Sequence, residues 1–336
     1  MDILLTSGWN EYELLDSGEG FRLEKFGPYI LQRPDPQVIW KKKLDKQTWS
    51  SADAVFARTS EDRGTWQVKK ELPEKWLIHY NNLSFWVKLS PFKHTGVFPE
   101  QHMQWDFITE CIGSRLRSHN NKTQGVTGEG GFPTAHSDNR NEHWREGNDR
   151  QDPEGILNQV QDDKQPNVLN LFAYTGIATL AAAAAGARVT HVDASKPTIG
   201  WARDNQIASK LEQKPIRWIL DDAVKFVQRE IKRGNRYDGI ILDPPVFGHG
   251  PDGTVWKFNE SFPPLMELCK QVLSDNPLFI IVNAYAISSS SLMLQNVLQD
   301  VTEHLEGTIE VGELVLEEKI NKRPLSTGIF ARWQSK

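Results

Sequence analysis

The residues best suited to chemistry are acidic side chains that follow short apolar segments in the second half of the chain. Asp193 ends one such segment, Asp221-Asp222 follow the next, and Asp243 ends a third. Carboxylates accept hydrogen bonds from hydroxyl and amino groups. Asp193 can accept hydrogen bonds from ribose hydroxyls, and Asp221-Asp222 can reach the amino group of adenine. Together with Gly176, which follows the first apolar segment at a helix start, these positions predict an adenosine site.

The elements that must position these acids alternate from Asn167 to the end of the chain. The predicted strands are Val168–Phe172, Arg188–Asp193, Ile216–Leu220, Tyr237–Asp243, Leu278–Asn283, Ile309–Leu316 and Ile329–Trp333, with helical patterns between the first six. This order predicts βαβ units, hence an α/β Rossmann-like domain with a mostly parallel seven-stranded sheet and an antiparallel edge hairpin. Ligands of such sheets bind beyond the carboxyl ends of the strands, where the acids lie.

The loop after the first of these strands indicates which adenosine ligand is bound. It reads Asn170–Gly176, with a single glycine that allows close backbone approach at a helix start. A dinucleotide site requires the spacing G-x-G-x-x-G to hold its pyrophosphate. The loop lacks that spacing, which disfavours a dehydrogenase and favours a donor without phosphates.

The fourth strand ends in Asp243-Pro244-Pro245-Val246-Phe247. Two prolines remove backbone donors and stiffen the turn. Their carbonyls and the Asp243 carboxylate are expected to form an acceptor-rich cluster that holds a planar nitrogen nucleophile, with Phe247 stacked on its ring. Methyl transfer from a sulfonium needs mainly positioning of the two reactants, which such a cluster supplies.

These motifs resemble the class I S-adenosylmethionine-dependent methyltransferases. In detail they resemble the group that modifies large-subunit ribosomal RNA at cytosine C5 or guanine N7. The matching segments are His94–Gln101, Asn170–Gly176, Val192–Ser195, Ala202–Asn205, Asp221-Asp222 and Asp243–Phe247. The resemblance covers about 91–116 and 167–336, roughly two thirds of the chain, and implies S-adenosyl-L-methionine as cofactor.

The resemblance also implies roles for individual residues. It assigns methyl-donor binding to Thr95, Phe98, Gln101, Phe172, Tyr174, Thr175, Gly176, Asp193, Ala194, Ser195, Asn205, Asp221, Asp222 and Asp243, and catalysis to Asp243, Pro244, Pro245 and Phe247. The segment that contains Thr95 is expected to close over the donor. Two positions depart from the group: Glu100 and His102 stand where relatives often have aspartate and arginine.

The two cysteines narrow the chemistry of the acceptor. Enzymes that methylate cytosine C5 need a thiolate that adds to the ring. Cys111 and Cys269 instead lie at core positions of helical patterns, and no cysteine follows the fourth or fifth strand. The sequence therefore argues against C5 methylation and for a nitrogen acceptor.

The rest of the chain predicts two further parts. Residues 1–90 read as a β-rich accessory domain, with hairpin turns at Gly27-Pro28 and Asn81-Asn82, and they do not resemble the RNA-binding module of the cytosine enzymes. Residues 91–336 form the expected catalytic domain, interrupted by a polar, flexible insertion at about 117–166.

Composition limits the partners. The net charge is −5, so any basic surface for RNA must be local, with Lys41–Lys43 beside Trp40 as one candidate. The chain carries neither an evident secretory signal nor a bilayer-spanning run, and its two distant cysteines suit neither disulfides nor zinc, which predicts a cytoplasmic protein without metal or membrane. RNA, most plausibly ribosomal RNA, is the favoured substrate. The alternatives are methylation of a small molecule or protein side chain, and a non-catalytic donor-binding or scaffold protein.

Overall fold

The computed structural model describes residues 2–58, 64–124 and 165–336. Its centre is one eight-stranded sheet, formed by β1 (Asp2–Thr6), β9 (Asn167–Leu171), β10 (Arg188–Asp193), β11 (Ile216–Leu220), β12 (Gly239–Leu242), β15 (Phe279–Ala284), β16 (Gly307–Glu317) and β17 (Pro324–Ser335). The strand order is β1-β16-β17-β15-β12-β9-β10-β11. Five neighbouring strands, β15 to β11, run parallel, and β17 is antiparallel to both β15 and β16.

This topology confirms the Rossmann-like α/β class and corrects one detail. The sheet has eight strands rather than seven, because β1 pairs in parallel with β16 from Asp2 opposite Gly312 to Thr6 opposite Leu316. The closing hairpin of β16 and β17 is therefore not the edge of the sheet. Although β1 lies within the first ninety residues, it belongs to the large sheet.

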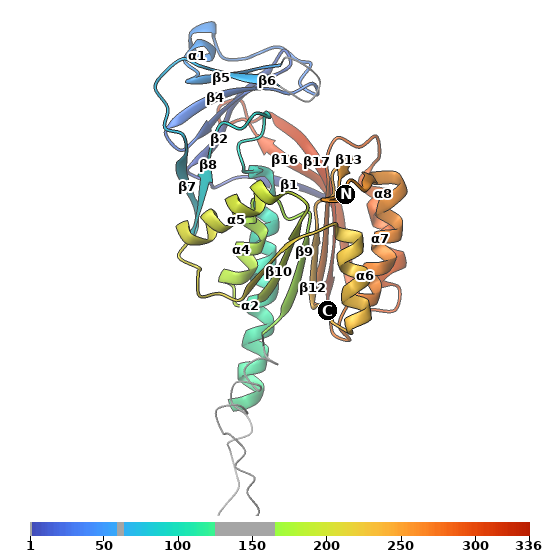
Figure 1. Cartoon of the computed structure of the whole chain (residues 1–336). Coiled ribbons are helices and arrows are strands. Elements are labelled where there is room, and N and C mark those ends of the chain that lie inside the picture. Colours follow the sequence, from blue (N-terminus) through green and yellow to red (C-terminus); the bar gives the residue numbers. More distant parts are fainter. Residues whose placement is uncertain (1, 59–63, 125–164) are drawn as a thin grey trace, which may run out of the picture.

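Helices cover both faces of the large sheet (Figure 1). On one side lie α2 (His102–Gln124), α4 (Ile177–Ala184) and α5 (Lys196–Ala208), and on the other α6 (Ala223–Arg233), α7 (Phe258–Val272) and α8 (Ser291–Thr302). Successive side chains of a strand point to opposite faces. Accordingly Leu169 and Leu171 pack in the cluster of α6 to α8, and Val168 packs with α2 and α4.

The N-terminal part lies over the carboxyl edge of this sheet (Figure 1). Its five-stranded sheet contains β2 (Tyr12–Gly18), β3 (Phe21–Phe26), β4 (Tyr29–Pro34), β5 (Ala54–Arg58) and β6 (Gly64–Val68), with the short helix α1 (Lys46–Ser50) between β4 and β5. Strands β7 (Trp76–Tyr80) and β8 (Leu83–Val87) form a separate hairpin. The hairpins predicted at Gly27-Pro28 and Asn81-Asn82 are confirmed.

Two connecting segments complete the described chain. A single 3-10 turn, η1 (Pro99–Gln101), leads into α2, and a small hairpin of β13 (Phe247–His249) and β14 (Val255–Lys257) follows β12. Of the expected insertion at 117–166, residues 117–124 are instead the end of helix α2, and 125–164 lie outside the described residues. In the described parts of the chain, every helix is too short or too polar to cross a lipid bilayer.

The segment before η1 packs tightly against helix α5. Gly96 has a φ of 93°, and a Cβ added there would lie 2.1 Å from the Trp201 ring. The Trp201 indole in turn donates a hydrogen bond of 2.9 Å to the Trp86 carbonyl oxygen on β8. Glycine at position 96 therefore permits the contact that joins this segment, α5 and the β7–β8 hairpin.

We expect Gly96→Ala to lower the free energy of unfolding by about 2–4 kcal/mol, because the methyl group overpacks the Trp201 contact and the left-handed backbone adds strain. Chemical denaturation monitored by tryptophan fluorescence measures this change. Gly200→Ala on α5 is the control, because no atom lies within 4 Å of its added Cβ; it should stabilise by roughly 0.5–1 kcal/mol. Equal stability of Gly96→Ala and wild type would contradict the packing argument.

Candidate active site

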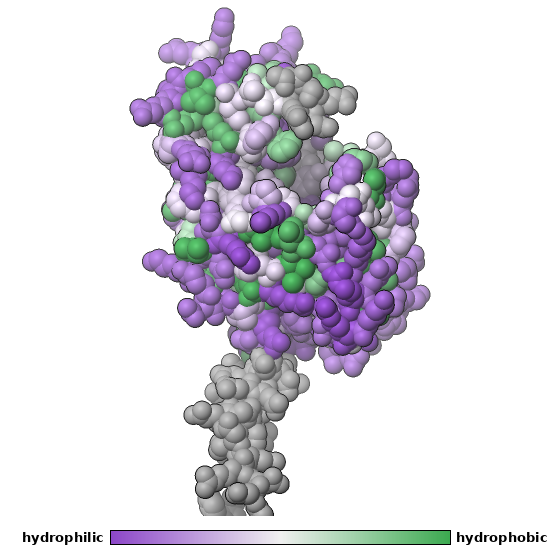
Figure 2. Space-filling view, in the orientation of Figure 1, coloured by the Kyte–Doolittle hydropathy of each residue, from purple (hydrophilic) through white to green (hydrophobic). Residues whose placement is uncertain are grey.

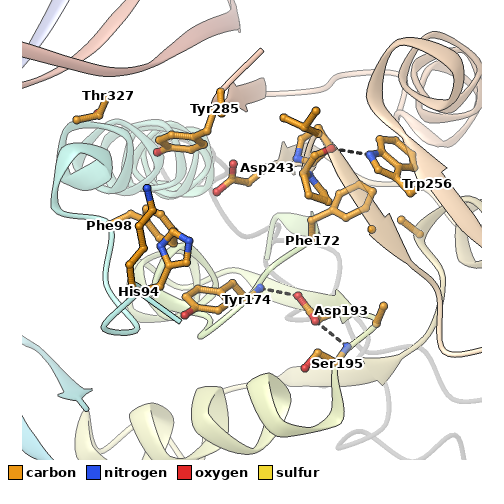
Figure 3. Close-up of a pocket in the computed structure, with 18 of the residues that line it drawn as sticks. His94, Phe98, Phe172, Tyr174, Asp193, Ser195, Asp243, Trp256, Tyr285 and Thr327 are labelled. Carbon is orange, nitrogen blue, oxygen red and sulfur yellow. Dashed lines mark hydrogen bonds between the residues drawn. The ribbon is translucent and has the colours of Figure 1, made fainter. Parts of the chain in front are cut away.

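A cavity of about 580 Å³ lies between the carboxyl edge of the large sheet and the β-rich region. The molecular surface is hollowed between the upper part and the body below it (Figure 2). Figure 3 shows that side chains from several strand ends converge on this space, with Asp243 between Tyr285 and Phe172. A volume of this size suits a ligand as large as a nucleoside with a further group attached.

The cavity collects most of the residues that the sequence singled out. The predicted residues that line it are Phe98, Phe172, Tyr174, Asp193, Ala194, Ser195, Asp221, Asp222, Asp243, Pro244 and Pro245. Gln101, Thr175 and Gly176 line a smaller cavity of about 30 Å³, which shares Phe98, Tyr174 and Asp243 with the large one. Thr95, Asn205 and Phe247 line neither cavity.

The loop after β9 has a backbone conformation that residues other than glycine rarely adopt. Phe172, Tyr174 and Gly176 have φ values of 56°, 48° and 79°. Left-handed φ values in residues other than glycine cost energy and persist where the surroundings enforce them. Here the Tyr174 amide donates a hydrogen bond of 2.8 Å to an Asp193 oxygen. The Thr175 hydroxyl donates one of 2.6 Å to the Gly96 carbonyl.

Asp193 holds the ends of two strands together. One carboxylate oxygen accepts from the Tyr174 amide at 2.8 Å, and the other accepts from the Ser195 amide at 2.8 Å and the Thr198 hydroxyl at 2.9 Å (Figure 3). Burial raises the pKa of Asp193, and the hydrogen bonds from Ser195, Tyr174 and Thr198 oppose that rise. Each carboxylate oxygen has two lone pairs, so the oxygen bound to the Tyr174 amide keeps one for a ligand.

Asp221 and Asp222 follow β11, as the sequence indicated, and they differ in their surroundings. Asp222 is the N-cap of α6, where its side chain accepts from the Lys225 amide at 3.0 Å. Asp221, just before the helix, forms an ion pair with Arg229, about two turns along α6. Both side chains line the cavity, so it has an acidic wall beside Asp193.

Asp243 has partners that the sequence did not indicate. Its carboxylate accepts a hydrogen bond of 2.7 Å from the Gln101 side-chain amide. The same amide donates a hydrogen bond of 2.9 Å to the Tyr285 hydroxyl. Burial raises the pKa of Asp243 to about 7; the Gln101 hydrogen bond opposes this rise and the nearby Glu100 carboxyl adds to it. Gln101, expected among the donor-binding residues, thus contacts the predicted catalytic acid.

The Pro-Pro turn is held by a buried tryptophan. Trp256 on β14 donates from its indole nitrogen to the Pro245 carbonyl at 2.7 Å, and its ring lies 4.8 Å from that of Phe172 (Figure 3). One lone pair of the Pro245 carbonyl is therefore already used. The β13–β14 hairpin thus contributes an inner wall of the cavity through Trp256.

Three predicted residues act outside the cavity. Phe247 is 56% exposed with its ring 5.1 Å from that of His249, because β13 turns outward to pair with β14. Asn205 is buried and bridges the Trp86 amide and the Thr175 carbonyl. Gly176 packs closely against helix α5, since an added Cβ would lie 2.9 Å from the Ala202 Cβ.

Thr95 is buried and, among the described residues, its hydroxyl has no hydrogen-bond partner. Its neighbours in the chain still bring the segment 94–101 to the site, because the Phe98 ring lies 5.7 Å from Tyr174 and 5.5 Å from Tyr285. These rings give the cavity an aromatic surface on which a base can stack.

Sequence reasoning missed the side chains that the β-rich region and its neighbours contribute. Arg22, Arg33, Lys93 and His94 all line the cavity. Burial and the adjacent cations lower the pKa of His94 to about 3, so this ring is neutral. Lys93 and His94 adjoin the Thr95-Gly96 motif and offered a signal by position, whereas Arg22 and Arg33 sit in ordinary strand patterns that offered none.

Both cysteines lie in the core, as the sequence predicted. Cys269 on α7 and Cys111 on α2 are buried in separate clusters, and burial raises the pKa of each thiol to about 12. Neither lines the cavity. Within the described ranges, no three His, Cys, Asp or Glu side chains are grouped so as to hold a metal ion.

The raised pKa of Asp243 predicts a pH-dependent stability. The folded protein holds this proton up to about pH 7, and the unfolded chain releases it near the ordinary value of 3.8. The free energy of unfolding should therefore fall as pH rises from about 4 to about 7. Asp243→Asn removes this component, so melting curves should show the variant gaining stability over wild type at pH 8 but not at pH 4.

The exposed Asp300→Asn variant on α8 serves as the control and should follow the wild-type curve at every pH. Melting temperatures of wild type and Asp243→Asn that stay parallel from pH 4 to pH 8 would show that Asp243 titrates normally.

Comparison with known proteins places this site in context. The chain superimposes on the crystal structure of a SAM-dependent methyltransferase from Agrobacterium tumefaciens with a TM-score of 0.82 and 35% sequence identity, over 100% of this chain and 94% of that one. No protein-family profile matches the chain.

Two curated relatives match parts of the sequence. Ribosomal RNA large subunit methyltransferase K/L of Shewanella baltica is 39% identical over 90 residues, which are 26% of this chain and 12% of that protein. Ribosomal RNA large subunit methyltransferase I of Pseudoalteromonas translucida is 27% identical over 176 residues, 52% of this chain and 42% of that protein. The matched regions thus span less than half of either relative.

Proposed function

This chain belongs to the SAM-dependent methyltransferases, and on that premise we propose that it methylates a nitrogen atom of a base in RNA, most plausibly ribosomal RNA. The observation that carries the proposal is the half-buried Asp243 carboxylate in its Pro-Pro turn, in a cavity that contains no thiol. Because the chain belongs to this enzyme family, the hypotheses of a dehydrogenase and of a non-catalytic scaffold protein are not pursued.

The cavity fits the donor S-adenosyl-L-methionine. Its acidic wall supplies acceptors for ribose hydroxyls at Asp193 and for the adenine amino group at Asp221 or Asp222, and Phe172 supplies an apolar face. The donor carries a methyl group on a sulfonium, which is an electrophile with a good leaving group. Ser195 and Ala194 line the same wall and would complete this subsite.

Asp243 and its neighbours would orient the acceptor. In its charged form the carboxylate accepts a hydrogen bond from an N–H of the acceptor and can take up its proton. A pKa near 7 keeps both forms of Asp243 accessible at neutral pH. The Gln101 amide fixes the carboxylate, and the Phe98 and Tyr285 rings offer stacking surfaces for a base.

A nitrogen acceptor fits the available groups better than carbon C5 of cytosine. Methylation at C5 requires a thiolate that adds to C6 of the ring. The chain has only Cys111 and Cys269, and both are buried outside the cavity. Positioning a nitrogen lone pair toward an electrophilic methyl group needs no such nucleophile.

RNA as the substrate class rests on the relatives, whose names specify large-subunit ribosomal RNA. A small-molecule acceptor is the second candidate, because a net charge of −5 gives the molecule no general attraction for phosphates. The cytoplasm is the proposed location, which suits two free cysteines and an RNA substrate.

Two substitutions separate donor binding from transfer. Asp193→Ala should weaken S-adenosylmethionine binding about tenfold or more, because hydrogen bonds to a charged group are lost. Asp243→Ala should leave that binding within about twofold and slow methyl transfer at least about 100-fold. Calorimetry measures the first effect and a tritiated-methyl assay the second. Loss of donor binding in both variants would contradict this division of roles.

The substrate class is tested with total RNA from a strain that lacks this gene. Purified enzyme and tritiated donor should label one nucleotide in that RNA, and mapping should place the methyl group on a base nitrogen. Label on cytosine C5 would overturn the nitrogen assignment. Label confined to small molecules or protein in the same extract would favour the second candidate.

A further inference from the structure

Charge divides the cavity into two walls. Asp193, Asp221 and Asp222, at the ends of β10 and β11, form the acidic wall assigned above to the donor. The opposite wall comes from the β-rich region and the segment that follows it. Its three cations are Arg22 on β3, Arg33 on β4 and Lys93.

Two of these cations are neutralised by buried acids. Arg33 binds Glu24 through two hydrogen bonds of 2.7 Å, and Arg22 lies 3.2 Å from Asp35. Arg22 and Arg33 are themselves buried. Burial alone would raise the pKa of Glu24, but these two arginines lower it to about 2. These side chains therefore build the wall, and their charges are already balanced.

Lys93 differs from both arginines. Among the described residues, no carboxylate forms a salt bridge with its half-buried ammonium group. Its backbone is held in place, because the Lys93 carbonyl accepts a hydrogen bond of 3.2 Å from the Arg33 guanidinium. Burial and the neighbouring Arg22 lower the pKa of Lys93, and the Asp35 carboxylate opposes this only in part.

Lys42 of the β-rich region, unlike Lys93, has contacts within the protein for its ammonium group. Lys42 pairs with Glu19 at 3.5 Å and lies 4.2 Å from the centre of the Trp49 ring. The run Lys41–Lys43, considered above as a phosphate contact, is thus occupied at its centre by contacts within the protein. Of the three cations of this wall, Lys93 is the one without a salt bridge to any described residue.

We propose that Lys93 binds a phosphodiester group of the RNA substrate, next to the base that Asp243 receives. This inference rests on the proposed function. Lys93 and Asp243 line the same cavity, so a nucleotide whose base is received at Asp243 can place its phosphate against the β-rich wall. An anion placed there would balance Lys93, and a charge-assisted contact in a partly desolvated site is stronger than one in water.

The two anions that compete for this lysine make different predictions. One is the phosphodiester, and the other is the carboxylate of the methyl donor. A phosphate contact contributes to the salt dependence of RNA binding, with a slope of about 0.7 per contact for single strands. A contact with the donor carboxylate changes the affinity for S-adenosylmethionine and leaves that slope unchanged.

The test compares Lys93→Met with wild type, using the full-length protein and an RNA oligonucleotide that spans the nucleotide labelled by the wild-type enzyme. We expect RNA affinity at low salt to fall about tenfold, and the plot of log K against log salt to become shallower by about 0.7. Calorimetry should show S-adenosylmethionine affinity unchanged within twofold. Lys93→Arg should restore most of the RNA affinity.

Lys214→Met is the matched control, because this lysine is exposed in a turn outside the cavity. It should behave as wild type in both measurements. Weaker donor binding with an unchanged salt slope would assign Lys93 to the donor and overturn the inference, as would no change in either. A wild-type enzyme that labels no RNA would instead overturn the proposed function itself, and the inference would fall with it.

Discussion

The site depends on hydrogen bonds that hold the strained loop after β9 against its neighbours. Asp193 binds the Tyr174 amide on one side and Ser195 and Thr198 on the other, so the ends of β9 and β10 are fixed relative to each other. The Thr175 hydroxyl then binds the Gly96 carbonyl, which brings in the segment before α2. That segment carries Gln101, whose amide positions Asp243.

This chain of contacts explains how residues far apart in sequence form one site. The first links use backbone groups or the short side chains of Asp193 and Thr175, and the last uses the longer Gln101 side chain. The same network includes residues that line neither cavity or only support the loop from outside it. Asn205 supports the loop from behind through the Thr175 carbonyl, and Gly96 lets that segment approach Trp201.

The β-rich region contributes basic side chains to the cavity, whereas the large sheet contributes acidic ones. The large sheet contributes acids at its strand ends, which suit a donor with a positive sulfonium and several hydrogen-bond donors. The β-rich region contributes balanced arginines and one unbalanced lysine. A transferase has to bring two different molecules together, and under the proposed function each wall would receive one of them.

The sequence alone determined the family resemblance, the alternation of strands and helices, and the acids at the strand ends. These features are local: an apolar strand, the turn residue after it and an acid at its tip lie within a few residues of one another, and parallel strands bring their carboxyl ends to one edge. The hairpins at Gly27-Pro28 and Asn81-Asn82 were predictable for the same reason.

Only the tertiary structure decided which of these residues face one another. Pairing of β1 with β16 joins segments about 300 residues apart, and nothing local in Asp2–Thr6 indicates its partner. The outward turn of Phe247, the Gln101–Asp243 contact and the position of Lys93 depend likewise on packing between distant segments. Side-chain direction follows from those neighbours, which sequence patterns within one element do not encode.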